Sequence, residues 1–116
     1  MKENGKINYV ELPSRDLEVT KRFFAAAFGW SFTDYGPEYV AINDAGLDGG
    51  FYQSDKIATT DNGSVLVVLY SNDLNRALER VKAAGGSILQ DIFSFPGGKR
   101  FHFSDPNGNE YAVWSE

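Results

Sequence analysis

The amino-acid sequence predicts an α+β fold built from two βαβββ modules, and two observations carry that prediction. First, the segment Val10–Gly29 matches the segment Val67–Gly86 at a constant offset of 57 residues, with eight of twenty positions identical and no gap. Second, each copy contains a strand-like run, a polar turn and a helical pattern, and three more strand-like runs follow it. Each helix is therefore expected to cover one face of a four-stranded sheet. A ferredoxin-like βαββαβ fold is the alternative, but it needs fewer strands between its helices.

The helices are expected to begin directly after Asp16 and Asp73, because aspartate side chains accept hydrogen bonds from the free N–H groups of a first helical turn. In the second copy, apolar residues recur at helical spacing, at Leu74, Ala77, Leu78 and Val81. Both helices are expected to end at glycines, Gly29 in the first copy and Gly85-Gly86 in the second, where a left-handed cap fits.

Six further strand-like runs are separated by glycine, proline and asparagine turns. They are Trp30–Thr33, Glu38–Ile42 and Leu47–Gln53 after the first helix, and Ser87–Ile92, Lys99–Phe103 and Glu110–Trp114 after the second. One domain over residues 1–116 is expected, with a first module at about 6–53, a polar linker at 54–63 and a second module at about 64–115.

The composition of the chain restricts the classes of function that it can have. Eleven basic and sixteen acidic residues give a net charge of −5, which disfavours binding to nucleic acid and favours a cationic ligand. The chain has no cysteine, so disulfides and thiolate chemistry are excluded. No apolar run approaches the roughly 18 residues of a membrane span, and the first residues lack the apolar core of a signal peptide. A cytoplasmic protein that does not bind a membrane is expected.

The run Asp105-Pro106-Asn107-Gly108-Asn109 before the last strand, the paired strand–Asp-Leu–helix units and the segment Phe28-Gly29-Trp30 together resemble one known family. It is the vicinal oxygen chelate superfamily, also called glyoxalase/bleomycin resistance/dioxygenase, and the resemblance extends from Ile7 to Trp114. The resemblance implies an open, curved, barrel-like sheet of eight strands with the helices on its convex side. It also implies that the concave faces enclose a site, and that the chain forms a homodimer.

Metal-dependent members of that superfamily carry histidine or glutamate at four symmetric positions on the concave faces. By resemblance, three of these positions fall on Tyr9, Leu66 and Ala112, and the fourth falls near Gly49-Gly50-Phe51. None of these side chains is a usual ligand for a divalent metal. A member without the usual metal ligands, and without a metal or other cofactor, is therefore expected.

Strand alternation predicts which residues line the site. If Val10, Leu12, Val67 and Leu69 lie under the helices, their neighbours point to the concave faces. The ligand-binding residues expected on this basis, with Phe51 added as an aromatic that stacks on a ligand or packs in the core, are Tyr9, Glu11, Phe51, Leu66, Tyr70, Arg100, His102, Ala112 and Trp114.

His102 and Glu11 are the candidate catalytic residues. His102 is the only histidine, and histidine is the side chain that titrates near neutral pH without any perturbation. Glu11 would act as a general base if burial raised its pKa. The alternatives are a hydrogen-bonded strand histidine without a catalytic role, and a Glu11 carboxylate that pairs with Arg100 or lies in solvent.

The favoured function is metal-free binding of a small molecule, in the manner of bleomycin-resistance proteins, with a cationic or aromatic compound as the ligand. A lyase, isomerase or dioxygenase with a relocated metal site at Glu11, His102 and Glu110 is the first alternative. Metal-free acid–base catalysis by His102 and Glu11 is the second.

Overall fold

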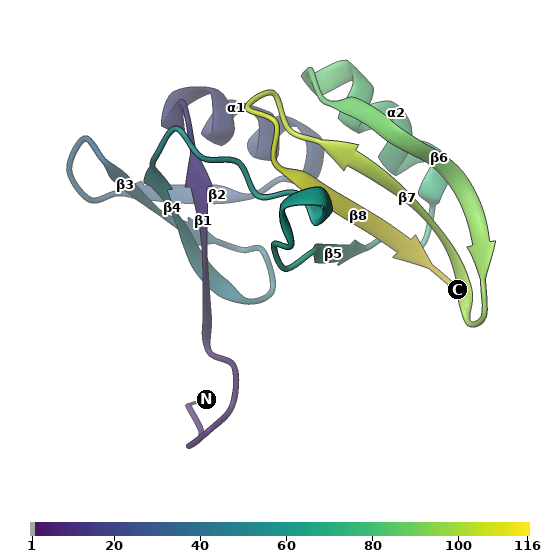
Figure 1. The fold of residues 1–116 in the computed structure, drawn as a ribbon, viewed down its shortest axis with the longest axis horizontal. Coiled ribbons are helices and arrows are strands. Elements are labelled where there is room, and N and C mark those ends of the chain that lie inside the picture. The colour runs from purple at the N-terminus through teal and green to yellow at the C-terminus, as the bar shows by residue number, and fades with distance from the viewer. Residues whose placement is uncertain (1) are drawn as a thin grey trace.

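The computed structural model describes residues 2–116 and contains two four-stranded sheets with the same strand order (Figure 1). The first module comprises β1 (Tyr9–Ser14), α1 (Leu17–Phe28), β2 (Ser31–Asp34), β3 (Tyr39–Asn43) and β4 (Asp48–Gln53). The second comprises β5 (Val67–Tyr70), α2 (Leu74–Ala84), β6 (Ser87–Phe95), β7 (Gly98–Ser104) and β8 (Glu110–Ser115), and a short 3₁₀ helix, η1 (Thr60–Asn62), lies between the modules.

Strand order confirms the predicted α+β fold of two βαβββ modules and excludes the ferredoxin-like alternative. The first sheet has the order β1-β4-β3-β2 and the second has the order β5-β8-β7-β6. Within each sheet the first strand pairs in parallel with the last, and the other pairs are antiparallel. β1 and β5 are therefore edge strands, and the two sheets remain open.

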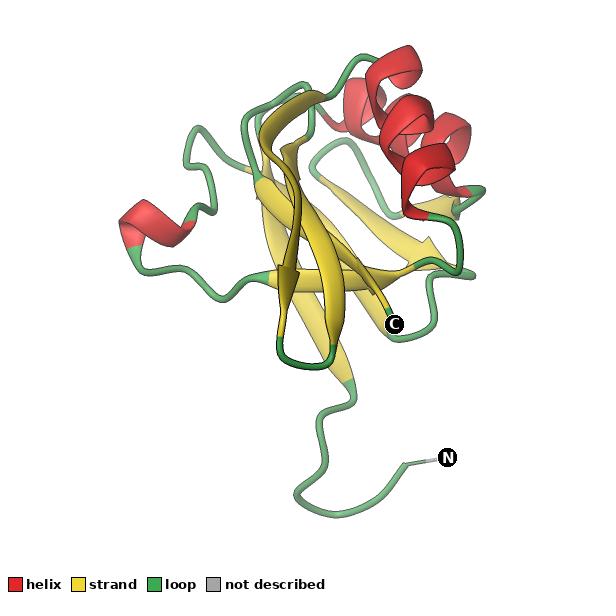
Figure 2. Cartoon of the chain, turned by 90° about the vertical axis from the view of Figure 1, so that its right-hand side faces the viewer, coloured by secondary structure: helices red, strands yellow, loops and turns green. Residues whose placement is uncertain are grey.

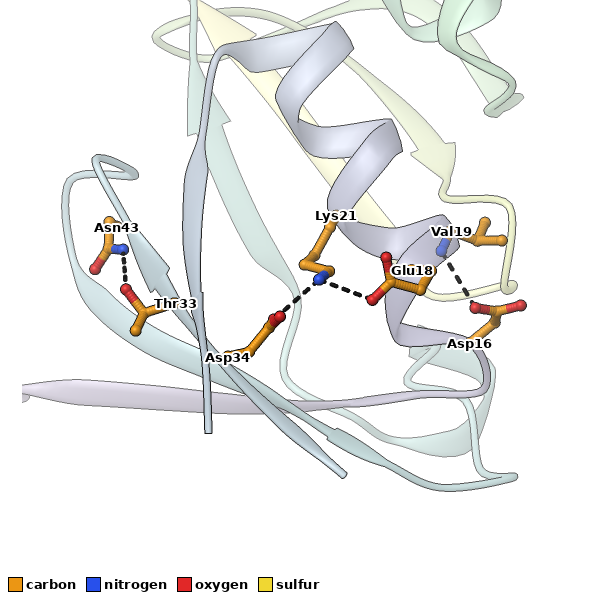
Figure 3. A network of polar contacts seen from close by, with 7 residues as sticks. All are labelled: Asp16, Glu18, Val19, Lys21, Thr33, Asp34 and Asn43. Carbon is orange, nitrogen blue, oxygen red and sulfur yellow. Dashed lines mark hydrogen bonds and ion pairs between the residues drawn. The ribbon is translucent and has the colours of Figure 1, made fainter. Parts of the chain in front are cut away.

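Both helices begin and end where the sequence predicts. Asp16 accepts a hydrogen bond from the backbone N–H of Val19 (3.2 Å), and Asp73 accepts one from that of Arg76 (3.1 Å). Gly29 and Gly85 end the helices in the left-handed conformation, with φ of 74° and 105°. Lys21, in the first half of α1, links the helix to the last residue of β2, because its ammonium lies 2.8 Å from Glu18 and 2.9 Å from Asp34 (Figure 3).

The core lies between the helices and the two sheets, and α1 contributes most of the aromatic side chains that join them. The helices lie side by side on one side of the strands (Figure 2). The Phe24 ring lies 5.7 Å from Phe51 of β4 and 5.1 Å from Tyr111 of β8, and the Phe23 ring lies 6.0 Å from Phe103 of β7. One helix therefore packs against both sheets.

Phe51 corrects one expectation about the site. Its side chain is fully buried against Phe24, on the face of the first sheet that the helices cover. The strand register explains this position, because Phe51 pairs with Leu12, whose side chain also lies in the core. The prediction that Phe51 lines the open surface is therefore wrong, and Phe51 is a core residue.

The Asp105–Asn109 run forms a tight turn held by one buried carboxylate. Asp105 accepts hydrogen bonds from the backbone N–H groups of Asn107 (2.9 Å) and Asn109 (3.1 Å) and from the hydroxyl of Tyr111 (2.8 Å). Burial raises the pKa of Asp105, and these hydrogen bonds oppose the rise. The hydrogen bonds to Asp105 thus hold the turn in shape, in addition to the contacts that the turn makes with the rest of the chain.

The same turn connects the two modules. The side-chain amide of Asn109 donates to the carbonyl oxygen of Pro13 (2.7 Å), and its oxygen accepts from the N–H of Ala58 (2.8 Å). Asn107 donates to the Asp16 carbonyl (3.0 Å) and to the Thr20 hydroxyl (2.8 Å). The turn before β8 therefore fastens the start of α1, the end of β1 and the segment between the modules.

No helix within residues 2–116 combines the length and the apolar character that crossing a membrane requires.

Replacing Asn109 with alanine is expected to destabilise the protein strongly. The change leaves the Pro13 carbonyl and the Ala58 N–H without partners, and each such loss costs about 1–3 kcal/mol. Urea unfolding followed by tryptophan fluorescence measures the difference. Asn75→Ala, at an exposed helix position, is the matched control and should change the unfolding free energy little. Equal effects of the two changes would contradict the role given to Asn109.

Candidate functional site

Each sheet has a face toward the helices and a face away from them, called here the open face. Val67 and Leu69 of β5 pack against the core, as Leu12 of β1 does. Alternation and register then place the remaining predicted residues on the open faces. They are Tyr9 and Glu11 on the first sheet, and Tyr70, Arg100, His102, Ala112 and Trp114 on the second.

Two predicted residues contribute less than expected. Ala112 lies at the centre of the second open face but has no exposed surface. Leu66 is half-buried and lies just before β5 rather than within it. The side chains at the open faces that reach solvent are mainly aromatic, with Tyr9 and Tyr70 exposed at 44% and 52%.

The open face of the first sheet carries a hydrogen-bonded cluster of Tyr9, Tyr39 and Glu11. The Tyr39 hydroxyl donates to a Glu11 carboxylate oxygen (2.9 Å), and the Tyr9 hydroxyl is hydrogen-bonded to that of Tyr39. Tyr39 lies over Gly50, where a larger residue would collide with its ring. Burial and the bonds to Tyr9 and Glu11 raise the pKa of Tyr39, so its hydroxyl stays protonated and keeps donating.

Sequence patterns identified Glu11 but missed its partner Tyr39. The alternative of a pair between Glu11 and Arg100 is wrong, since the ion pairs within residues 2–116 include none between these two side chains. Glu11 and His102 also share no hydrogen bond or ion pair, so the two candidate catalytic residues do not form a pair. Glu11 retains an oxygen that Tyr39 does not bond, and this oxygen can accept from a ligand.

The open face of the second sheet carries a histidine–carboxylate pair. His102 Nδ1 lies 3.1 Å from Glu110 Oε2, and both side chains are about nine-tenths buried. The other oxygen of Glu110 accepts from the backbone N–H (2.8 Å) and the hydroxyl (2.9 Å) of Thr60. Burial alone would raise the pKa of Glu110, but the bonds from Thr60 and His102 outweigh burial and lower it. Glu110 is therefore ionised and only accepts.

Arg100 lies two residues before His102 on the same strand and stacks on aromatic rings. Its guanidinium carbon lies 5.5 Å from the Phe93 ring centre and 5.6 Å from that of Phe95. Within residues 2–116 no carboxylate forms an ion pair with Arg100. Trp114 is its neighbour on β8 and packs edge-on against Tyr70 at 5.2 Å.

Residues 2–116 contain no group of three histidine, aspartate or glutamate side chains placed to hold a metal ion. Elsewhere, a cleft of about 520 Å³ lies where the two modules meet. Its walls include Val10 and Leu12 of β1, Trp30, and the strand residues Val67–Tyr70. Of the residues expected to bind a ligand, Tyr70 contributes to this cleft.

The chain belongs to the Glyoxalase/Bleomycin resistance protein/Dioxygenase superfamily, whose family model matches residues 6–113. Its fold is similar to that of a glyoxalase-related enzyme from Fulvimarina pelagi, with a TM-score of 0.79 and 20% identity over 97% of this chain and 88% of that one. TioX from Micromonospora sp. ML1 is also similar, with a TM-score of 0.72 and 18% identity over 96% of this chain and 98% of TioX.

Two curated relatives are longer than this chain. The anthracycline biosynthesis protein DauV of Streptomyces sp. (strain C5) is 28% identical over 94% of this chain and 41% of DauV. CFP32 of Mycobacterium tuberculosis (strain CDC 1551 / Oshkosh), provisionally named a glyoxylase, is 22% identical over 95% of this chain and 45% of CFP32. The chain spans less than half the length of each, and these likenesses assign it no particular reaction.

Glu110→Gln is expected to reduce stability at neutral pH and to have a smaller effect in acid. Because the fold lowers the pKa of Glu110 from its usual 4.5, the ionised carboxylate stabilises the folded chain above that value. This contribution disappears as the pH falls through the lowered folded pKa. Urea unfolding of both proteins across acid and neutral pH measures the difference.

Glu79→Gln is the control for that experiment, because Glu79 is exposed and lies 3.9 Å from Lys82 in a pair of little energetic weight. A stability difference for Glu110→Gln that stays constant, or grows, as the pH falls would contradict the ionised role of Glu110.

Proposed function

We propose that the chain is a metal-free binding protein for a small molecule, and that the ligand lies against the open faces of its sheets. The observation that carries the proposal is the Tyr9–Tyr39–Glu11 cluster. By resemblance, superfamily members with a metal centre have a histidine ligand at the position that Tyr9 occupies in this chain. The position holds aromatic surface and an anchored carboxylate. Such a combination of apolar surface and a few oriented polar groups is typical of small-molecule sites.

The chemistry of this cluster favours a cationic aromatic ligand. The free oxygen of Glu11 attracts a positive charge, and the rings of Tyr9 and Tyr39 offer faces for stacking or cation–π contact. The net charge of −5 adds a long-range attraction for cations. The name of one relative, an anthracycline biosynthesis protein, adds an anthracycline to the ligands worth testing.

A homodimer is part of this proposal. Four large side chains stay 40–52% exposed on β1, β4 and β5, an unusual amount of apolar surface for a small chain. They are Tyr9, Tyr52, Val68 and Tyr70. A second copy related by two-fold symmetry would cover this surface and enclose the open faces.

Light scattering is expected to give a mass about twice the 12.9 kDa of one chain at micromolar concentration. Val68→Glu should shift the equilibrium toward single chains, because it adds a charge to the surface that the partner would cover. A wild-type mass of one chain under these conditions would rule the dimer out.

A thermal-shift screen of aromatic amines, including an anthracycline, is expected to identify stabilising ligands, since a ligand at about 100 times its Kd adds about 2.7 kcal/mol. Glu11→Gln should weaken the binding of such an amine about tenfold or more by removing the charge that faces it. Tyr9→Ala should weaken it as well. Glu38→Gln, at an exposed position just before β3, is the matched control.

Binding that Glu11→Gln and Glu38→Gln leave equally strong would place the ligand elsewhere. Elemental analysis of the same samples provides the test of the metal-free assignment. One equivalent of a transition metal per chain, removed by a chelator together with ligand binding, would overturn it.

A further inference from the structure

The open face of the second sheet contains an unusual pair of atoms. Within residues 2–116, the buried side-chain nitrogen and oxygen atoms that have no hydrogen-bond partner are Arg100 Nε and His102 Nε2. Folded proteins leave few buried polar groups unpaired, and each exception requires an explanation. Arg100 and His102 are two residues apart on β7, so both side chains lie on the same face of one strand. The two exceptions are therefore neighbours.

The neighbouring carboxylate does not pair with these two nitrogens. Glu110 is the nearby carboxylate, and its oxygens already accept from Thr60 and from His102 Nδ1. The rings of Phe93 and Phe95 flank the guanidinium of Arg100, and Phe93 also stacks on His102 with ring centres 5.9 Å apart. The pair thus lies in an apolar setting, where a hydrogen bond to an incoming oxygen is stronger than in water.

We propose that Arg100 and His102 form a subsite for the carboxylate group of an aromatic or aliphatic acid. Arg100 Nε–H and His102 Nε2–H each donate to the carboxylate, and the apolar part of the ligand lies against Phe93 and Trp114. A singly charged group suits the subsite better than a phosphate dianion, because the ionised Glu110 lies beside His102 and repels additional negative charge.

The geometry links binding to proton uptake. Glu110 only accepts, so His102 Nδ1 carries a proton, and Nε2 can donate only when the ring holds a second proton. The groups that face the ring are Glu110 from β8, Arg100 from β7, and the uncharged Phe93 and Gln90 from β6. The carboxylate therefore bonds to the ring only when both ring nitrogens carry a proton.

Strand β6 offers a way into the subsite. It is the edge strand of the second sheet, and its pairing with β7 is irregular between Gln90 and Phe93. Such irregularities change the direction in which side chains point. A ring on an edge strand can move without breaking the hydrogen bonds between the inner strands. The Phe93 ring contacts both side chains, so the proposed route to the two nitrogens passes this ring.

The chain contains one histidine, so the imidazole signals of a ¹⁵N-labelled sample report on His102 alone. Benzoate is the probe, with benzamide, benzylammonium and phenyl phosphate as comparisons. Benzoate is expected to shift the Nε2 signal toward the doubly protonated ring with a millimolar Kd. Benzamide and benzylammonium should leave the signal unchanged, and phenyl phosphate should bind at least about tenfold more weakly.

Arg100→Gln should weaken benzoate binding at least about tenfold while His102 still reports on it, because one charge-assisted donor is lost. Lys99→Gln, at the neighbouring exposed position, is the matched control. Arg100→Lys keeps the charge but lacks the Nε donor, so it should also weaken benzoate binding. If circular dichroism shows that the Arg100→Gln variant is unfolded, the Arg100→Lys variant provides the test in its place.

Benzoate that leaves the His102 signals unchanged at about 50 mM would overturn the subsite. So would equal binding by Arg100→Gln, or binding of phenyl phosphate as tight as that of benzoate. The proposed amine site is tested separately, because it depends on Glu11 on the other sheet. Loss of one kind of binding with retention of the other therefore shows which of the two proposals fails.

Discussion

The bonds made by Asn109 are the constraint on which the rest of the structure depends. Its side chain holds the end of β1 through Pro13 and the segment between the modules through Ala58, and Ala58 in turn accepts from the backbone N–H of Glu110. These contacts keep Thr60 beside Glu110, and Glu110 holds the ring of His102. The turn that carries the family resemblance thus has a structural role. It also positions Glu110 on the second open face, because it holds the segment that contains Ala58 and Thr60.

The two open faces share one architecture but have opposite chemistry. The first ends in a carboxylate, Glu11, oriented by a tyrosine whose hydroxyl stays protonated. The second holds a cation, Arg100, and a histidine whose second nitrogen has no partner. Duplicated modules allow this difference, because corresponding strands position side chains alike while the side chains themselves vary. The repeat therefore supplies two scaffolds whose open faces carry opposite charges.

Sequence patterns predicted the elements well because their signals are local. Aspartate caps, helical spacing and strand alternation act over a few residues, and they located both helices and the faces of Tyr9 and Trp114. Phe51 was misplaced because its face depends on the register between β1 and β4, which no local pattern encodes. The bonds of Glu11 with Tyr39 and of Glu110 with Thr60 were missed for the same reason, since they join residues 28 and 50 positions apart.

The paired and unpaired buried polar groups lie in different parts of the molecule. In the turn before β8, the buried Asp105 and Asn109 have several partners each. On the second open face, two buried nitrogens have none, and each costs about 1–3 kcal/mol of a folding free energy of only about 5–15 kcal/mol. The other buried side-chain nitrogen and oxygen atoms within residues 2–116 have hydrogen-bond partners, so the fold does not require these two nitrogens to be unpaired. Their position beside an anchored carboxylate and aromatic rings is the arrangement that a bound acid would complete.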